Sequence, residues 1–310
     1  MSLRPILAWA LAAAPLVAGA QAPEKKQDVP SFGVSTELVY VRFHVDRKGG
    51  FLDSIRKDQL RVLEDGKPQA IAILETPSTR ERTIPPEVTL GLDVSSSVMD
   101  ARLLDETLVK EVLFASLSEQ AKVGLCAFGG QLRCLRPPTR DADALLEGFQ
   151  EAIDFSRETR GEGTRLYDSI ADICRRAAKA GDKSQRALVV FSDGLDNRGG
   201  RMKDAVQAAL ESDVRIYAVL LSQAFQDTAR GLGPFGRGAP NRAMYDYKKF
   251  DLGRLAEETG GKSYEPGTLD EKTMAKILRS IGAEISMENV VGYQPEGAAS
   301  GRRRHVKVEL

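Results

Sequence analysis

The chain has 310 residues, and its 44 basic side chains balance its 44 acidic ones. A formal net charge of zero leaves no electrostatic footprint for nucleic acid, so a binder that relies on a basic surface is excluded. A hydrophobic fraction of 42% is that of a globular protein with a sizeable core, and the length suits one large domain or two modest ones.

Residues 1–20 have the pattern of a secretory signal peptide. An apolar stretch follows an early arginine, and Ala18-Gly19-Ala20 fits the small-residue cleavage rule, so Gln21 is the expected first mature residue. The alternative is an uncleaved anchor, but a span needs about 20 apolar residues, and Pro15 interrupts this shorter segment. We predict an exported protein, periplasmic or secreted, with no transmembrane segment in the mature chain and a flexible lead over 21–33.

Residues 34–80 have the period-two pattern of a small antiparallel β module. Apolar and polar side chains alternate over 39–46, as in a half-buried strand. Glu64-Asp65-Gly66-Lys67 is a hairpin signal, and the returning strand is expected at 71–74. The C-terminal segment, 288–310, ends in strict alternation and is expected to add a strand to this module.

Residues 87–287 alternate strands with helices. Val88–Leu92 and Ala187–Phe191 are apolar runs typical of buried parallel strands. This order predicts an α/β fold, a doubly wound and mostly parallel sheet with helices on both faces. After the first strand, four residues are spaced as one face of a helix: Leu104, Leu108, Val112 and Ala115.

Oxygen-bearing side chains stand where these strands end. Asp93-Val94-Ser95-Ser96-Ser97 follows the first strand, Ser192-Asp193-Gly194 follows the second, and Thr164 lies in a glycine-rich turn that opens another helix. Because parallel strands share one carboxyl edge, Asp93 and Asp193 are expected to meet there with Thr164 between them. A purely local alternative is that a serine caps the next helix and Asp93 belongs to the turn.

Two carboxylates and three hydroxyls, without a nearby histidine or cysteine, form a hard oxygen set. Such a set suits Mg²⁺, Mn²⁺ or Ca²⁺ rather than zinc. Neutral hydroxyls leave the ion with residual positive charge, so an acidic group of a partner protein could complete its coordination.

These residues resemble the metal-ion-dependent adhesion site of the von Willebrand factor A domain. The family pattern is D-x-S-x-S, then a distant threonine, then an aspartate after a later strand. Here it is matched by Asp93, Ser95, Ser97, Thr164 and Asp193. The resemblance implies that the hydroxyls bind the ion, that the aspartates act directly or through water, and that the domain binds a protein ligand through an Asp or Glu.

A second resemblance concerns the flanking segments. Val62 to Gln69 is similar to a hairpin found in exported bacterial proteins with a "VWFA-related" domain, described first from acidobacteria. Leu252 to Lys262 and Val291 to Pro295 also resemble that subgroup. The implied organisation is a β module before the A domain.

Residues 222–250 are rich in glycine and proline and lack periodicity. Long loops of this kind are functional or disordered. One hypothesis is that the loop borders the metal edge and helps to select an acidic partner; the alternative is an insertion without a role. Gly231 to Gly236 spells G-x-G-x-x-G, but it does not follow a strand directly, so we reject a dinucleotide site.

Cys126 and Cys134 lie on opposite arms of an expected hairpin, and Cys174 lies on an apolar helix stripe. A three-residue turn at Gly129–Gln131 would set the first two opposite each other, whereas a two-residue turn would offset them. Export permits a disulfide, but its formation depends on that geometry.

An enzyme is the less favoured reading. The only histidines, His44 and His305, are in the expected β module, so a serine nucleophile would lack a base. A metal-assisted hydrolase would need a poised base, for which Glu162 and Asp168 are the nearest candidates in sequence. A third class is a structural envelope protein whose A-like domain works without metal.

Overall fold

The computed structural model describes residues 38–47, 50–79, 84–95, 98, 108–179, 184–221, 251–268, 270–295 and 304–310. These residues all belong to one compact unit that begins at Leu38. Several predictions concern residues outside the described ranges: the signal peptide and flexible lead, Ser97, Leu104 and the 222–250 loop. Among the helices within those ranges, none combines the length and the apolarity that crossing a membrane requires.

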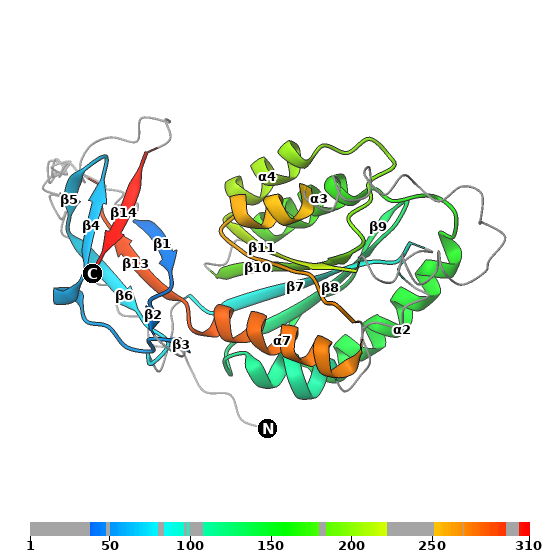
Figure 1. Ribbon diagram of the computed structural model, residues 1–310, viewed down its shortest axis with the longest axis horizontal. Helices are drawn as coiled ribbons and strands as arrows, with labels where there is room; N and C mark the ends of the chain where they lie inside the picture. Colours follow the sequence, from blue (N-terminus) through cyan, green and yellow to red (C-terminus); the bar gives the residue numbers. More distant parts are fainter. Residues whose placement is uncertain are drawn as a thin grey trace, which may run out of the picture. The chain divides into compact units, whose positions relative to one another are not determined.

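A six-stranded sheet forms the centre of the larger part of the molecule (Figure 1). Its order is β12 (Ser263–Tyr264), β11 (Val214–Leu220), β10 (Gln185–Ser192), β7 (Pro86–Asp93), β8 (Lys122–Phe128) and β9 (Leu132–Thr139). All neighbours pair parallel except β8 and β9, which form the expected antiparallel hairpin at one edge. The predicted doubly wound α/β fold is thus confirmed.

Helices cover both faces of this sheet (Figure 1). One face carries α3 (Leu166–Lys179), α4 (Met202–Glu211) and a helix over 251–258; the other carries η2 (Leu108–Phe114), α2 (Ala142–Glu158) and α7 (Glu271–Ser286). The central strand β10 sends Val189 into one core and Leu188 into the other. Burial on both sides explains why its sequence is an unbroken apolar run.

Two of the helices begin at aspartates that cap them. Asp141 Oδ1 accepts the amides of Asp143 and Ala144 at 3.0 and 3.1 Å at the start of α2. Asp270 accepts the amide of Thr273 at 2.9 Å at the start of α7. These bonds satisfy amides that have no partner inside the helix.

The helix after β7 differs from its prediction. Residues Leu108–Phe114 form a π-helix, whose hydrogen bonds join residues five apart. The wider turn buries Leu108, Val112 and Leu113, whereas Ala115 is exposed. Placing Ala115 on the buried stripe was therefore wrong, because the 3.6-residue period does not hold here.

The β8–β9 hairpin shows which of the two possible loop lengths separates the strands that carry Cys126 and Cys134. Its loop has three residues, closed by a bond from the amide of Gly129 to the carbonyl of Gln131 at 2.9 Å. Cys126 and Cys134 are therefore directly paired, and they form a disulfide. Cys174 is buried in α3, as expected of a core residue.

Small antiparallel sheets are built from both ends of the described chain. One is β1 (Val39–Phe43), β13 (Asn289–Tyr293) and β6 (Ile71–Glu75); another is β14 (Val306–Glu309), β4 (Arg61–Glu64) and β5 (Lys67–Gln69); β2 (Asp46–Arg47) pairs with β3 (Gly50–Phe51). A single 3₁₀ turn, η1 (Lys57–Gln59), precedes β4. The C-terminal strand thus joins the module, as predicted.

The hairpin turn at Asp65-Gly66 is also confirmed, with positive φ at both residues. The returning strand, however, is β5 rather than the predicted one at 71–74. Those residues form β6, which pairs with β13 in another sheet. Since β13 comes from more than 200 residues later in the chain, no local pattern indicated this pairing.

Buried ionic contacts link these sheets with their surroundings. Glu64 accepts a hydrogen bond from the Tyr293 hydroxyl at 2.9 Å and pairs with Arg304 at 2.8 Å. Glu288, between α7 and β13, pairs with Arg215 at the start of β11 and lies 3.8 Å from Arg42 of β1. These contacts place charged side chains inside the fold, where partners offset the loss of hydration.

Candidate metal centre

Asp93 ends the central strand β7 at the carboxyl edge of the sheet. Its side chain is only 2% exposed. Oδ1 accepts the amide of Ser95 at 2.9 Å, and Oδ2 accepts the hydroxyl of Ser192 at 2.6 Å. These bonds fix both carboxylate oxygens at the end of the strand.

Asp193 follows the neighbouring parallel strand β10 and is 1% exposed. Its Oδ1 accepts the amide of Leu195 at 3.0 Å. Burial and the nearby charge of Asp193 together raise the pKa of Asp93 to about 7. The two carboxylates therefore act on each other electrostatically, as expected of side chains that meet at one edge of the sheet.

Thr164 is joined to the loop that starts at Asp193. Its amide donates to Asn197 Oδ1 at 2.8 Å, and its carbonyl accepts the Asn197 amide at 3.2 Å. The preceding Gly163 has a φ of 79°, and a side chain there would overlap Asn197. The glycine-rich sequence of this turn thus has a steric reason.

Four of the five predicted ligands are described, and they come from three adjoining segments. Ser95 follows β7 and donates its amide to Asp93, Thr164 precedes α3, and Asp193 follows β10. Ser97 lies outside the described residues. The assignment of these five residues to a metal stays a prediction.

The chemistry of this donor set fits a hard divalent cation. In the described part of the chain, no lysine or arginine forms an ion pair with Asp93, and the charge that most affects it is another carboxylate. Two buried like charges are unfavourable without a counter-charge. A cation bound by oxygen ligands would supply that charge.

Three supporting residues were missed by the sequence analysis. Ser192 is fully buried and bonds both Asp93 and the amide of Gly194. Asn197 holds the Thr164 turn. Asp196 accepts the Tyr167 amide at 3.1 Å and so caps the first turn of α3. Ser192 had a signal in the sequence, a hydroxyl at the end of a strand, but nothing local indicated the partners of the other two.

The residues nominated for hydrolysis have other contacts. Glu162 accepts from the Gln131 side chain at 3.1 Å, and Asp168 pairs with Arg165 at 3.2 Å while 40% exposed. His44 contacts the carbonyl of Glu284 in α7 at 2.6 Å, and the backbone amide of His305 bonds Asp65. Within the described residues, no group of three or more His, Cys, Asp or Glu side chains could hold a metal.

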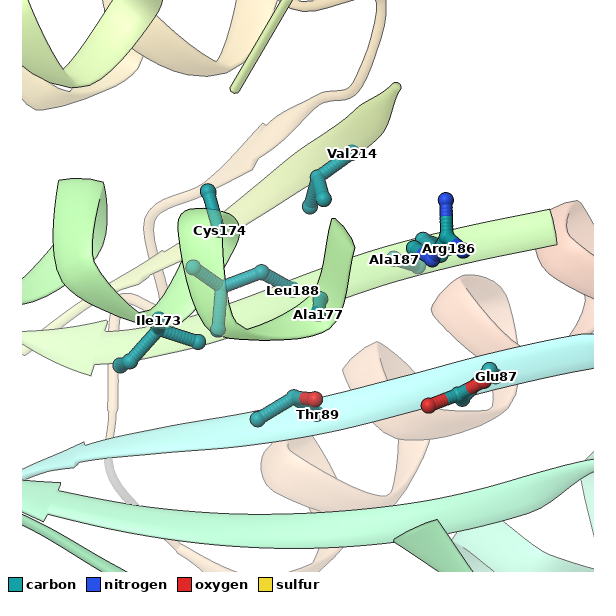
Figure 2. Close-up of a pocket in the computed structure, with 9 residues that line it drawn as sticks. All are labelled: Glu87, Thr89, Ile173, Cys174, Ala177, Arg186, Ala187, Leu188 and Val214. Carbon is teal, nitrogen blue, oxygen red and sulfur yellow. The ribbon is translucent and has the colours of Figure 1, made fainter. Parts of the chain in front are cut away.

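A small cavity lies toward the opposite ends of the strands. Figure 2 shows Ile173, Cys174 and Ala177 of α3 beside strand residues that include Thr89 and Leu188. Its volume of about 10 Å³ holds about one water molecule. The cavity is a packing gap and is too small for an organic ligand.

Comparisons with known proteins agree with this architecture. Residues 88–195 match the von Willebrand factor type A domain family. No curated protein matches the chain.

Three solved structures are similar to parts of this chain at low sequence identity. An aerotolerance-related membrane protein from Bacteroides fragilis is 22% identical, with 64% of this chain and 98% of that one covered and a TM-score of 0.44. The conserved hypothetical protein BatB from Bacteroides thetaiotaomicron is 18% identical, with 65% of this chain and 98% of that one covered and a TM-score of 0.48. The manganese-loaded TRAP protein of Plasmodium vivax is 16% identical, with 56% of this chain and 74% of that one covered and a TM-score of 0.35.

The family match begins in β7 and ends just after Asp193, so it includes both strands that carry the aspartates and the turn that carries Thr164. The resemblance to the von Willebrand factor A domain is thereby confirmed over these residues, while the five metal ligands and the acidobacterial subgroup stay predictions. Residues 88–195, which lie within a mostly parallel sheet covered by helices on both faces, are the part of this chain that matches the von Willebrand factor type A domain family.

Proposed function

We propose that the protein is a divalent-cation-dependent binding module for other proteins. Asp93, Ser95, Ser97, Thr164 and Asp193 would hold Mg²⁺, Mn²⁺ or Ca²⁺. The ion would supply an electrophilic centre, and an Asp or Glu carboxylate of the partner would occupy its open position. Domains of this family are mostly protein-interaction modules, which agrees with such a role.

The observation that carries this proposal is the buried pair of aspartates. Both are almost inaccessible to solvent, and burial together with the charge of Asp193 raises the pKa of Asp93. A fold that keeps two carboxylates together at the ligand-binding edge of its sheet gains from a bound cation. Neutral hydroxyls complete the set, so the ion keeps positive charge for an acidic partner.

Thermal unfolding tests the metal directly. The mature protein is compared in EDTA, Mg²⁺, Mn²⁺ and Ca²⁺. A cation at about 100 times its dissociation constant stabilises the fold by roughly 2.7 kcal/mol, which raises the melting temperature. Asp193→Ala is expected to abolish that increase.

Asp168→Ala is the matched control, because Asp168 is a partly exposed acid near the Thr164 turn and already pairs with Arg165. This variant should keep the full metal-dependent shift. A wild-type protein whose melting temperature responds to no cation would contradict a resident metal and would favour a structural envelope protein that works without one.

Partner binding forms the second part of the test. Once a partner is captured, its binding should be lost in EDTA and in Asp93→Ala and restored by adding the cation to the wild type. Binding that survives both changes would sink the carboxylate-to-metal mechanism.

The remaining parts of the proposal concern segments outside the described residues. Residues 1–20 would direct export to the periplasm or beyond, and residues 222–250 would help to select an acidic partner. Deleting 226–242 should weaken partner binding without changing the metal-dependent shift in melting temperature. Unchanged partner binding would assign no role to this part of the loop.

The domain division also stays a proposal: a β module at 34–80, an A domain at 87–287 and a C-terminal segment at 288–310. Catalysis is not favoured, because Glu162 and Asp168 are engaged by Gln131 and Arg165.

A further inference from the structure

The tip of the β8–β9 hairpin holds two segments of the candidate metal centre. The carbonyl of Phe128 accepts the amide of Val94, next to Asp93, at 2.8 Å. The carbonyl of Gly129 accepts the amide of Arg165, next to Thr164, at 2.9 Å. The hairpin tip therefore fixes the backbone beside two of the proposed ligands.

Close packing strengthens this connection. A side chain at Gly130 would overlap Glu162, which lies in the turn before Thr164. The Gln131 side chain donates to the Glu162 carboxylate at 3.1 Å. Because the tip and the turn touch without a gap, a displacement of the tip is transmitted to the turn.

The ladder between β8 and β9 is interrupted near its middle. Among the described strands, β9 lies at the edge of the sheet and pairs with β8 alone. The register between the two strands is irregular on both sides of Leu125, and Pro137 and Pro138 of β9 have no amide hydrogen to donate. The Cys126–Cys134 disulfide joins the arms at the first pair after this irregularity.

We propose that the Cys126–Cys134 disulfide is a positioning element of the metal centre. It anchors the hairpin tip, and the tip in turn holds the Asp93 and Thr164 segments in the arrangement that binds the cation. This inference rests on the proposed metal function. It assigns the two cysteines a role in metal affinity besides the stability that a disulfide ordinarily gives.

Cys134 is exposed, so a reductant can reach the bond. A water-soluble phosphine cleaves it cleanly: phosphorus is oxidised to the phosphine oxide with the oxygen of one water molecule, the sulfur–sulfur bond breaks, and the two protons of that water end on the two thiols. Cys174 is fully buried and is not part of a disulfide, so it takes no part.

The test is Mn²⁺ binding to the mature protein by isothermal titration calorimetry at 25 °C, before and after phosphine treatment. Reduction is expected to raise the dissociation constant about tenfold, the lower end of the effect of losing support behind a metal ligand. Circular dichroism checks that the reduced protein stays folded, and amide hydrogen exchange at Val94 and Arg165 should become faster.

The double variant Cys126→Ala/Cys134→Ala is the control for side effects of the phosphine. It should bind Mn²⁺ like the reduced wild type and should not respond to the phosphine. If this variant does not fold, the comparison of Mn²⁺ affinity between the oxidised and reduced wild-type protein still tests the inference. Equal Mn²⁺ affinity in the oxidised and reduced folded protein overturns the inference. An oxidised protein that binds no Mn²⁺ overturns the proposed metal function and this inference with it, and the amide exchange then shows separately whether the disulfide braces the two segments.

Discussion

The two ends of the six-stranded sheet both bury charged side chains, but they arrange them in opposite ways. At the carboxyl ends of the strands, Asp93 is bonded by a hydroxyl and an amide while Asp193 acts on it as a like charge. At the amino ends, Glu288 is 3% exposed and lies against the guanidinium groups of Arg215 and Arg42.

This contrast separates architecture from function. A buried carboxylate beside arginines has its counter-charge within the protein, so it serves the fold. A buried carboxylate beside a second carboxylate is electrostatically unfavourable, and the cation that we propose at this edge would offset that cost. The arrangement of charges therefore supports the proposal that the metal binds at the carboxyl end of the sheet.

The largest expected effect on stability is at the amino ends of the strands, where Glu288 pairs with Arg215. Glu288→Ala removes the partner of Arg215 and leaves a buried guanidinium without its counter-charge. Breaking a buried pair in this way lowers the free energy of unfolding by about 3–5 kcal/mol. Urea denaturation at pH 7 measures it, and a loss below about 1 kcal/mol would mean that water reaches Arg215 once Glu288 is gone.

Neutralising a carboxylate at the carboxyl ends of the strands should instead raise the free energy of unfolding when no metal is bound. In EDTA at pH 8, Asp93→Asn removes one of the two like charges and should raise the free energy of unfolding by about 2 kcal/mol. In saturating Mg²⁺ the same variant should be less stable than the wild type, because a ligand is lost. A decrease in EDTA would show that Asp93 is already compensated in the metal-free protein.

The pH dependence sharpens this prediction. The folded pKa of Asp93 is raised from 3.8 to about 7, so this group stabilises the metal-free fold fully below about pH 4. That contribution is lost as the pH rises through 7, where the folded protein must ionise a buried carboxylate. The stability difference between Asp93→Asn and wild type in EDTA should therefore grow from pH 5 to pH 8, measured by urea denaturation at each pH.

A smaller effect is expected from the hydroxyl that supports Asp93. Ser192→Ala removes the bonds to Asp93 Oδ2 and to the Gly194 amide, and unsatisfied buried groups lower stability by about 1–3 kcal/mol. The Mn²⁺ affinity should fall as well. Ser192→Thr, which keeps the hydroxyl, is the control; an affinity unchanged in the alanine variant would remove Ser192 from the site.

Much of the fold could be predicted because the pattern repeats along the chain. The apolar runs at Val88 and Ala187 and the alternation of strands with helices specify a parallel sheet covered on both faces. The π-helix could not be predicted, since Leu108 and Val112 are equally compatible with an α-helix. The partner of β6 was also missed, because its pairing with β13 depends on tertiary contacts.

At the candidate site, the sequence indicated the residues but not their support. Asp93 and Asp193 follow from a rule about where parallel strands end, and Thr164 was indicated by its place in a glycine-rich turn before a helix. Asn197 was not predictable, because its bond to Thr164 joins residues 33 positions apart in two irregular loops. The disulfide depended on whether the hairpin loop had two or three residues, which the glycines at 129 and 130 left open.

The smallest expected change in stability comes from an exposed ion pair of Arg42, which also lies near the buried Glu288. Arg42 also donates to Asp213 at 2.9 Å, but the side chain of this acid is 68% exposed. Asp213→Asn should change the free energy of unfolding by less than about 1 kcal/mol, because water screens an exposed pair. Asparagine also tolerates the φ of 50° at this position, so no backbone strain is added. Urea denaturation of Asp213→Asn and Glu288→Ala compares their losses in free energy of unfolding. Similar losses would show that burial does not determine the strength of these ion pairs. The contrast between the two ends of the sheet would then lose its physical basis.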